Sequence, residues 1–114
     1  MGKNTVNATI KVTFRHTEST QALRSYVEDK VMPLLEKYCY NDVHADVTLS
    51  VEKDVHTAEV RVSVKGPDLF AKISTEDLYT SIDGMVNSLQ SQLRKFKEKV
   101  VDHHRDEARE FTSI

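Results

Sequence analysis

A long amphipathic helix is predicted between Ser74 and Val101, and it strongly limits what the chain can fold into. The segment opens with Ser-Thr-Glu-Asp, where a hydroxyl residue is followed three places later by a carboxylate, a pattern close to a capping box. Apolar residues then recur at alternating steps of four and three, which places them on one face of a helix. They are Leu78, Ile82, Met85, Leu89, Leu93, Phe96 and Val100.

Four segments of alternating apolar and polar residues are predicted to be strands. They are residues 9–15, 45–52, 58–65 and the shorter 69–73. The link Lys53-Asp54-Val55 is short, so the second and third strands should form an antiparallel hairpin. Because every strand has one apolar face, we expect one side of the sheet to face water and both helices to cover the other.

An earlier helix is predicted from Thr20 to Tyr38, because Leu23, Val27 and Val31 follow helical spacing. Pro33 lies inside this segment and removes one backbone hydrogen bond, so the sequence predicts either a kink or two separate helices. The expected order is β-α-β-β-β-α. We therefore predict an α+β fold with a four-stranded sheet and two helices packed on one face.

The 114 residues are enough for one domain, with a formal net charge of −2. That excess lies in the last residues, so the sequence predicts a neutral domain at 1–101 and a charged, flexible tail at 102–114. No apolar run is long enough to span a membrane, and the N-terminus lacks a signal peptide pattern, so a cytoplasmic location is expected. Cys39 is the single cysteine, which excludes an internal disulfide.

Four basic residues close together near the end of the long helix have two interpretations. They are Arg94, Lys95, Lys97 and Lys99. Cations near a helix C-terminus compensate the helix dipole, which is a purely structural role. Alternatively they bind phosphates, because a helix of about 40 Å is longer than strands of about 30–34 Å and its basic end would overhang the sheet. A groove between the two helices could then be basic, while the wet face of the sheet holds the acids.

Catalytic and metal-binding chemistry is not indicated by the sequence. His44 and His56 would begin strands at opposite ends of the hairpin, and His103-His104 lie beyond the core, so the histidines should not converge on a metal. No glycine-rich phosphate loop or serine elbow is present. We expect no enzyme, no cofactor and no small-molecule substrate.

Three aromatic residues, Tyr26, Tyr79 and Phe70, could stack on bases, and each also has another interpretation. Tyr26 and Tyr79 are predicted to lie in or beside the core, and Cys39 is expected to be packed. Phe70 falls on the polar side of its strand, where a contact with a partner is the functional interpretation.

The chain resembles the bacterial ribosome hibernation factors, the group of hibernation-promoting factor and ribosome-associated inhibitor A, in its short form. The resemblance covers roughly residues 8–104 and rests on an ordered set of segments. These are Phe14-Arg15-His16, residues 22–27 with Lys30, residues 35–38, Val51-Glu52-Lys53 with His56, residues 76–79, Ile82-Asp83 and residues 92–97.

This resemblance implies a function and a partner. Members of the group bind the small ribosomal subunit in the cleft where mRNA and tRNAs pass, contact rRNA through basic residues on and between the two helices, and block translation when growth stops. Short members either promote ribosome dimers with a partner factor or hold single ribosomes inactive, and the sequence leaves these alternatives open.

Carried over by position, eight residues are the expected rRNA contacts. Arg24, Lys30, Lys95, Lys97 and Lys99 come first, followed by Arg15, Lys37 and Arg94. Helices of the group usually have Lys or Arg where this chain has Ser88 and Ser91, so binding should depend strongly on the last basic turns. The alternative function is a protein–protein regulatory module of the same fold, without ribosome binding, that uses Phe70 and Arg61 on the wet sheet face.

Overall fold

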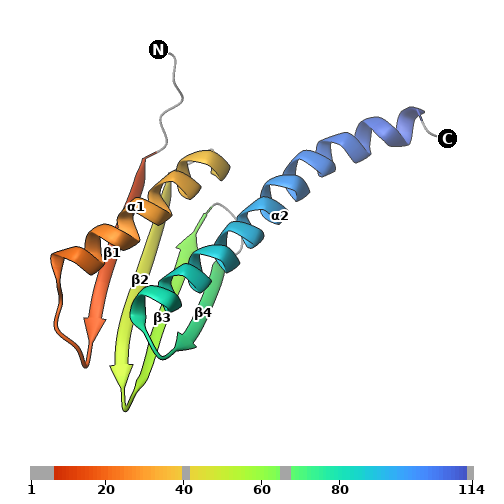
Figure 1. Cartoon of the computed structure of the whole chain (residues 1–114). Coiled ribbons are helices and arrows are strands. Elements are labelled where there is room, and N and C mark those ends of the chain that lie inside the picture. The colour runs from red at the N-terminus through yellow and green to blue at the C-terminus, as the bar shows by residue number, and fades with distance from the viewer. Residues whose placement is uncertain (1–6, 40–41, 65–67, 113–114) are drawn as a thin grey trace.

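The computed structural model describes residues 7–39, 42–64 and 68–112, with side chains up to Lys97. The side chains of Lys99, His103 and His104, and the last residue of the third predicted strand, lie outside this description. The elements follow the predicted order (Figure 1). They are β1 (Ala8–Arg15), α1 (Gln21–Tyr38), β2 (Val43–Glu52), β3 (Val55–Ser63), β4 (Leu69–Thr75) and α2 (Leu78–Thr112).

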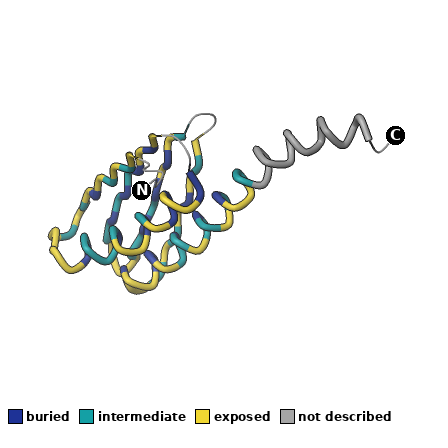
Figure 2. The backbone as a smooth tube through the Cα atoms, turned by 90° about the horizontal axis from the view of Figure 1, so that it is seen from above, coloured by how far each residue is buried: buried dark blue, intermediate teal, exposed yellow. Residues whose placement is uncertain are grey.

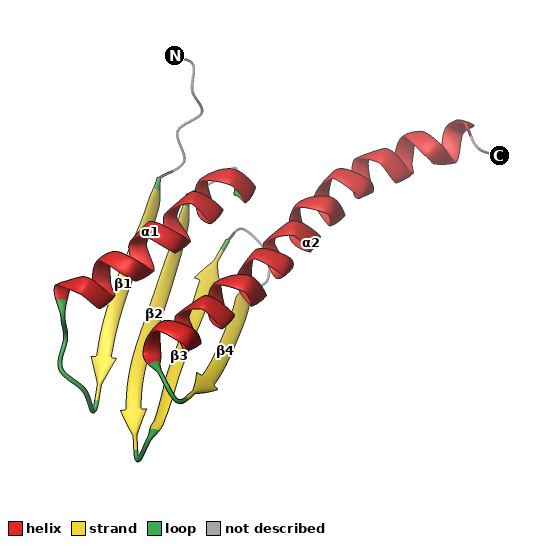
Figure 3. Cartoon of the chain, viewed as in Figure 1, coloured by secondary structure: helices red, strands yellow, loops and turns green. Residues whose placement is uncertain are grey.

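The four strands form one mixed sheet in the order β1-β2-β3-β4 (Figure 3). β1 and β2 are parallel and are joined by α1, whereas the β2–β3 and β3–β4 pairs are antiparallel. The β2–β3 hairpin closes through Lys53 and Asp54, whose φ angles of 50° and 38° are both positive. Two consecutive positive φ values are typical of a type I′ turn, which matches the twist of a two-residue hairpin. The predicted hairpin is therefore confirmed, with a link of two residues.

Both helices cover the same face of the sheet, as the alternation predicted (Figures 1 and 2). Ala45, Val47 and Leu49 of β2 point to this face and are fully buried. From the other layer, α2 contributes Ile82, Met85, Leu89 and Leu93, which are also fully buried. From Leu78 to Leu93 the predicted apolar stripe of α2 is thus the core side of the helix. Phe96 is half-buried, and the side chain of Val100 lies outside the described residues.

Pro33 does not divide α1. A single helix runs from Gln21 to Tyr38 with Pro33 inside it, so the alternative of two separate helices is wrong. Thr20 caps this helix, because its side-chain oxygen accepts a hydrogen bond of 3.1 Å from the backbone N–H of Leu23.

The cap of α2 lies three residues later than the sequence predicted, at Asp77 instead of Ser74. Ser74 and Thr75 are still in β4, and Asp77 is the capping residue, because its Oδ2 accepts a 2.9 Å hydrogen bond from the backbone N–H of Thr80. Thr75 Oγ1 accepts from the N–H of Asp77 at 3.1 Å, which fixes the turn between the two elements. The hydroxyl residue of the predicted cap therefore belongs to the preceding turn.

Ser81 ties the start of α2 to the sheet. It is fully buried, and its Oγ donates a 2.6 Å hydrogen bond to the backbone carbonyl of His56 in β3. The hydroxyl of Thr75 lies 2.7 Å from the same Oγ, so the buried polar group is satisfied.

α2 also ends later than predicted. It continues to Thr112, so the backbone of residues 102–112 is helical and the helix has 35 residues. At 1.5 Å per residue this is roughly 52 Å, whereas the ten residues of β2 span about 33 Å. The helix therefore extends beyond the sheet, as Figure 1 shows. The division of the chain into a domain and a flexible tail stays a prediction.

A glycine allows α2 to approach β4 closely. A Cβ atom added at Gly84 would lie 3.0 Å from Cγ2 of Ile73, which is too close unless the isoleucine moves. We expect Gly84→Val to lower the free energy of unfolding by about 1–3 kcal/mol, because overpacking displaces neighbours. Urea denaturation measures this loss.

Two controls test the origin of that loss. Asn87→Val adds a similar side chain at an exposed position of the same helix and should change stability by no more than about 0.5 kcal/mol. In an Ile73→Ala background the cost of Gly84→Val should shrink, because the clashing atoms are gone. An equal cost in both backgrounds would contradict the proposed contact.

Candidate nucleic-acid interface

Cations from both helices converge on Tyr38, the last residue of α1. The Nζ atom of Lys37 lies 5.2 Å from the centroid of the Tyr38 ring, and Nζ of Lys97 on α2 lies 5.8 Å from it. Tyr38 is 6% exposed, so its ring is held by packing, whereas Lys37 is exposed and Lys97 is half-buried. Each contact is a cation–π interaction that fixes a flexible lysine in place.

The phenol of Tyr38 adds two further residues to this site. Its pKa lies below the ordinary value of 10.0, chiefly because the oxygen accepts a hydrogen bond from the Gln90 side chain, and next because Arg94 donates to it and Lys37 is close. Gln90, Arg94 and Lys97 are spaced by four and three residues and so share one face of α2. We call these five residues, Lys37, Tyr38, Gln90, Arg94 and Lys97, the Tyr38 cluster.

The same two helices meet again nearer the start of α2. The hydroxyl of Tyr26 donates a 2.6 Å hydrogen bond to Oδ1 of Asp83, and this bond raises the pKa of Tyr26. The rings of Tyr26 and Tyr79 are 4.9 Å apart and nearly perpendicular, at 78°. Lys30 Nζ lies 5.2 Å from the Tyr26 ring. This end of the helix–helix contact therefore carries a carboxylate, whereas the Tyr38 cluster carries three cations.

Sequence reasoning assigned no role to Asp83 or Gln90. A signal was present, because Tyr79, Asp83 and Gln90 continue with Arg94 and Lys97 at helical spacing, as a second stripe beside the apolar one. A stripe of mixed chemistry has no hydrophobic signature, so only the position of α1 shows that it forms a contact.

The open face of the sheet carries mixed charge. Across its strands Lys11 lies opposite Asp46, Asp46 opposite Arg61, and Glu59 opposite Lys72. Asp46 also binds His44, with 3.0 Å between Nε2 and Oδ1. The hypothesis that this face holds the acids is therefore wrong, because cross-strand pairs place a base beside each of these acids.

The residues match one family of known proteins. Residues 10–101 fit the family described as sigma 54 modulation protein / S30EA ribosomal protein. The chain belongs to this family. The ribosome hibernation promoting factor of Escherichia coli is 35% identical over 94 residues, which cover 82% of this chain and 98% of that protein. The factor of the same name from Pseudomonas putida is 32% identical, and 79% of this chain and 87% of that protein are covered. The resemblance stated from the sequence is thereby confirmed.

Solved structures agree with the S30EA fold. The N-terminal domain of Thermus thermophilus Protein Y is 32% identical, with a TM-score of 0.68, and the match covers 80% of this chain and 97% of that one. A ribosomal subunit interface protein from Coxiella burnetii has a TM-score of 0.67 at 23% identity, which shows the fold alone. That match covers 78% of this chain and 97% of the Coxiella chain. The predicted α+β fold is confirmed by these neighbours and by the strand order.

The structure brings together only part of the rRNA contacts predicted from the family. Lys37, Arg94 and Lys97 meet in the Tyr38 cluster, and Lys30 lies beside Tyr26 at the same helix–helix contact. Lys95 is exposed on another side of α2, one turn after Gln92, whose amide binds the backbone of β4.

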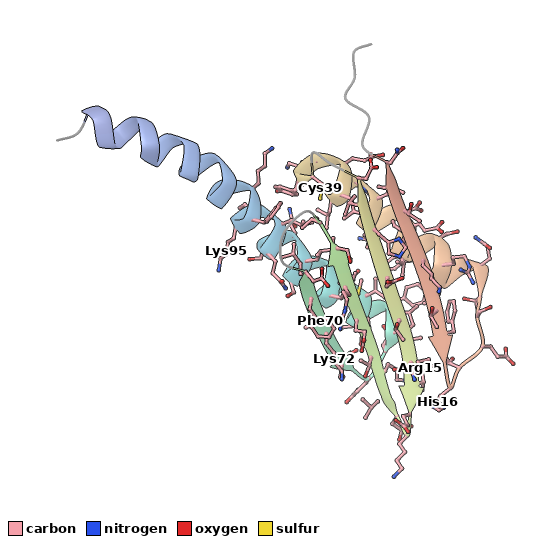
Figure 4. All side chains as sticks on the ribbon, turned by 180° about the vertical axis from the view of Figure 1, so that it is seen from behind. Arg15, His16, Cys39, Phe70, Lys72 and Lys95 are labelled. Carbon is pink, nitrogen blue, oxygen red and sulfur yellow. The ribbon has the colours of Figure 1, made fainter. Side chains whose placement is uncertain are left out.

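The two arginines near β1 lie apart from the Tyr38 cluster. The Arg24 guanidinium lies 5.5 Å from the Phe14 ring centroid, and its Nη1 donates to the carbonyl of Val12 at 3.5 Å. Arg24 therefore points toward β1. Arg15 is at the end of β1 and points to the open face of the sheet (Figure 4).

Other predictions from the sequence concern metals, membranes and Cys39. Within the described residues, no three His, Cys, Asp or Glu side chains are grouped so that they could hold a metal ion. His44 and His56 lie at opposite ends of the hairpin, as predicted. No described helix is long and apolar enough to cross a membrane. Cys39 is buried, and burial raises the pKa of its thiol, which agrees with a packing role.

The two interhelical tyrosines should ionise on opposite sides of pH 10. The folded state stabilises the phenolate of Tyr38, so this group contributes stability above pH 10 that is lost as the pH falls through its lowered pKa. It stabilises the neutral phenol of Tyr26, so that contribution is present below pH 10 and is lost as the pH rises through the raised pKa. Tyrosinate absorbance measures both ionisations.

Two single variants assign these steps. Tyr38→Phe should remove the earliest part of the titration, and Tyr26→Phe should remove the latest part, with circular dichroism as the control for folding. Difference titrations that place both tyrosines together near pH 10 would contradict the positive surroundings of Tyr38.

Proposed function

We propose that this protein is a ribosome hibernation factor that binds the small ribosomal subunit through the side of the molecule formed by α1 and α2. It occupies the channel for mRNA and tRNAs, inhibits translation, and preserves inactive ribosomes without a catalytic step. Its contacts are to rRNA phosphates, and its location is the cytoplasm. Relatives named ribosome hibernation promoting factor support this role.

The observation that carries the proposal is the Tyr38 cluster. Three cations from two helices, Lys37, Arg94 and Lys97, surround one packed ring. Phosphate recognition needs cations held at a surface, and it requires no strict sequence motif. Holding the side chains in advance lowers the entropy lost when they bind.

The length of α2 argues against a purely structural role for its basic residues. Dipole compensation falls off within the last turn of a helix. Arg94 and Lys97 lie four to five turns before Thr112, where α2 ends. Their charge therefore has no helix end to compensate, and this favours a partner with negative charge.

The carboxylate of Asp83 makes the two ends of the helix–helix contact different in charge. It lies about three turns before Arg94 on the same face of α2 and is occupied by Tyr26. A carboxylate repels phosphate, so an RNA strand should approach the Tyr38 end of the contact and avoid the Asp83 end. A neutral domain can bind RNA in this way, because its charges are separated along one surface.

We expect the double variant Lys37→Ala/Lys97→Ala to bind small ribosomal subunits more weakly, because two phosphate contacts are lost. Each contact contributes about 0.7–0.9 to the slope of log affinity against log salt, so the slope should fall by about 1.4–1.8. Co-sedimentation at several salt concentrations measures it. Lys11→Ala, an exposed cation on the open sheet face, is the matched control and should keep the full slope.

Two results would contradict this function. Binding that does not depend on salt would exclude phosphate contacts as its source. Absence of ribosome binding would instead favour the protein–protein regulatory module, whose surface would include the exposed Phe70. A sucrose gradient of ribosomes with and without the protein also shows whether the product is single ribosomes or dimers, and hence whether a dimerising partner factor acts.

A further inference from the structure

Phe70 is a large aromatic side chain left at the surface. It is 43% exposed and points to the open face of the sheet from β4, the last strand at that edge (Figure 4). Arg61, its cross-strand partner on β3, places its guanidinium 5.6 Å from the ring centroid. Arg61 lies on β3, the strand next to β4 in the sheet. The face of the Phe70 ring that is turned toward the sheet edge is therefore available to another planar group.

The backbone of Phe70 is held by α2. Its N–H donates to Oε1 of Gln92 at 3.4 Å, and its carbonyl accepts from Nε2 of Gln92 at 2.8 Å. Gln92 Nε2 also donates to Oγ of Ser88 at 3.2 Å. This double contact fixes Phe70 and occupies the outward backbone groups of β4 at this residue, so strand addition is blocked here.

Further cations lie around this aromatic residue. Lys72 follows two residues later on the same face of β4, roughly 7 Å along the strand, and is exposed. Lys95 follows Gln92 by one turn of α2 and is also exposed. Figure 4 shows Lys95, Phe70 and Lys72 in this order along one side of the molecule. We call these residues, Arg61, Phe70, Lys72 and Lys95, the Phe70 patch.

Two acids lie opposite the patch. Glu59 is the cross-strand partner of Lys72 and is half-buried, and among the described residues these two form no ion pair. Asp46 is the cross-strand partner of Arg61 and also contacts His44, with 3.0 Å between Oδ1 and Nε2. The patch therefore has three cations around a single ring, against two cross-strand carboxylates of which one is held by His44.

We propose that the Phe70 patch is a second RNA-contacting surface, which stacks one unpaired base on Phe70 and holds the flanking phosphates with Lys72 and Lys95. An exposed ring beside cations is the arrangement that binds single strands, because every base has a flat face and every nucleotide a phosphate. Arg61, Phe70 and Lys72 lie on the open face of the sheet, and Lys95 lies beside them on α2. The patch shares no residue with the Tyr38 cluster.

Other occupants fit the patch less well. A second copy of this chain would bring like charges together at the patch. A peptide cannot add as a strand at Phe70, because Gln92 holds the backbone groups. A folded protein that binds through apolar contact would find one exposed ring here and no wider apolar surface among the described residues.

The test is the affinity of the full chain for a fluorescent oligouridylate of about 12 nucleotides, a length within typical site sizes, measured by anisotropy at low salt. Phe70→Leu should weaken binding by about five- to 150-fold, which is the contribution of one stacked base to affinity. Phe70→Tyr keeps a ring and should bind like the unchanged protein. Val55→Ala is the control, since Val55 is an apolar side chain that is 49% exposed in β3, outside both the patch and the helix–helix contact, and it should have no effect.

The same variants separate this inference from the proposed function. Equal affinity of Phe70→Leu and the unchanged protein for oligouridylate overturns the Phe70 patch, and a protein partner for Phe70 then becomes the better explanation. The proposed function would still hold in that case if binding to the small subunit depends on Lys37 and Lys97 but not on the Phe70 ring. Equal loss in Phe70→Leu and Val55→Ala would also overturn the patch, because the effect would not belong to stacking at Phe70.

Discussion

Each strand of this protein is apolar on one side only, and the rest of the structure depends on this constraint. Both helices must cover the same face, so they lie side by side although more than 50 residues separate their partners in sequence, as with Tyr26 and Asp83. The contact between them is made by aromatic and polar side chains at the surface, above the buried core. The charges of two distant segments are combined there in a site that neither segment forms alone.

The length of α2 adds a second consequence. Because α2 continues to Thr112, Arg94, Lys95 and Lys97 lie in the middle of this helix, near the point where it leaves the sheet. Gln92 uses the same helix to hold the edge strand, and Lys95 emerges one turn later. One helix thus presents Lys97 toward Tyr38 of α1, while Lys95 is exposed one turn after the residue that holds β4. The Tyr38 cluster and the Phe70 patch are the surfaces that follow from these two directions.

The sequence predicted the fold almost completely, because periods of two and of 3.6 residues survive in every element. It misplaced both ends of α2: the Ser74 hydroxyl resembles a cap but belongs to β4, and residues 102–112 lack an apolar stripe although they are helical. The candidate site was predicted in part. Lys37, Arg94 and Lys97 were named, but their meeting point at Tyr38 depends on the distance between two helices. Charge count alone also could not show that Arg24 turns to Phe14 and that the open sheet face is mixed.

The central claim is that the helix-covered face, at its Tyr38 end, is turned to the RNA of the small ribosomal subunit. Lysine reactivity in the free and the ribosome-bound protein, followed by mass spectrometry of acetylated residues, tests this most directly. The account predicts that Lys37 and Lys97 lose reactivity on binding, while Lys53 in the β2–β3 turn keeps it. Protection of Lys53 with unchanged reactivity of Lys37 and Lys97 would contradict the account.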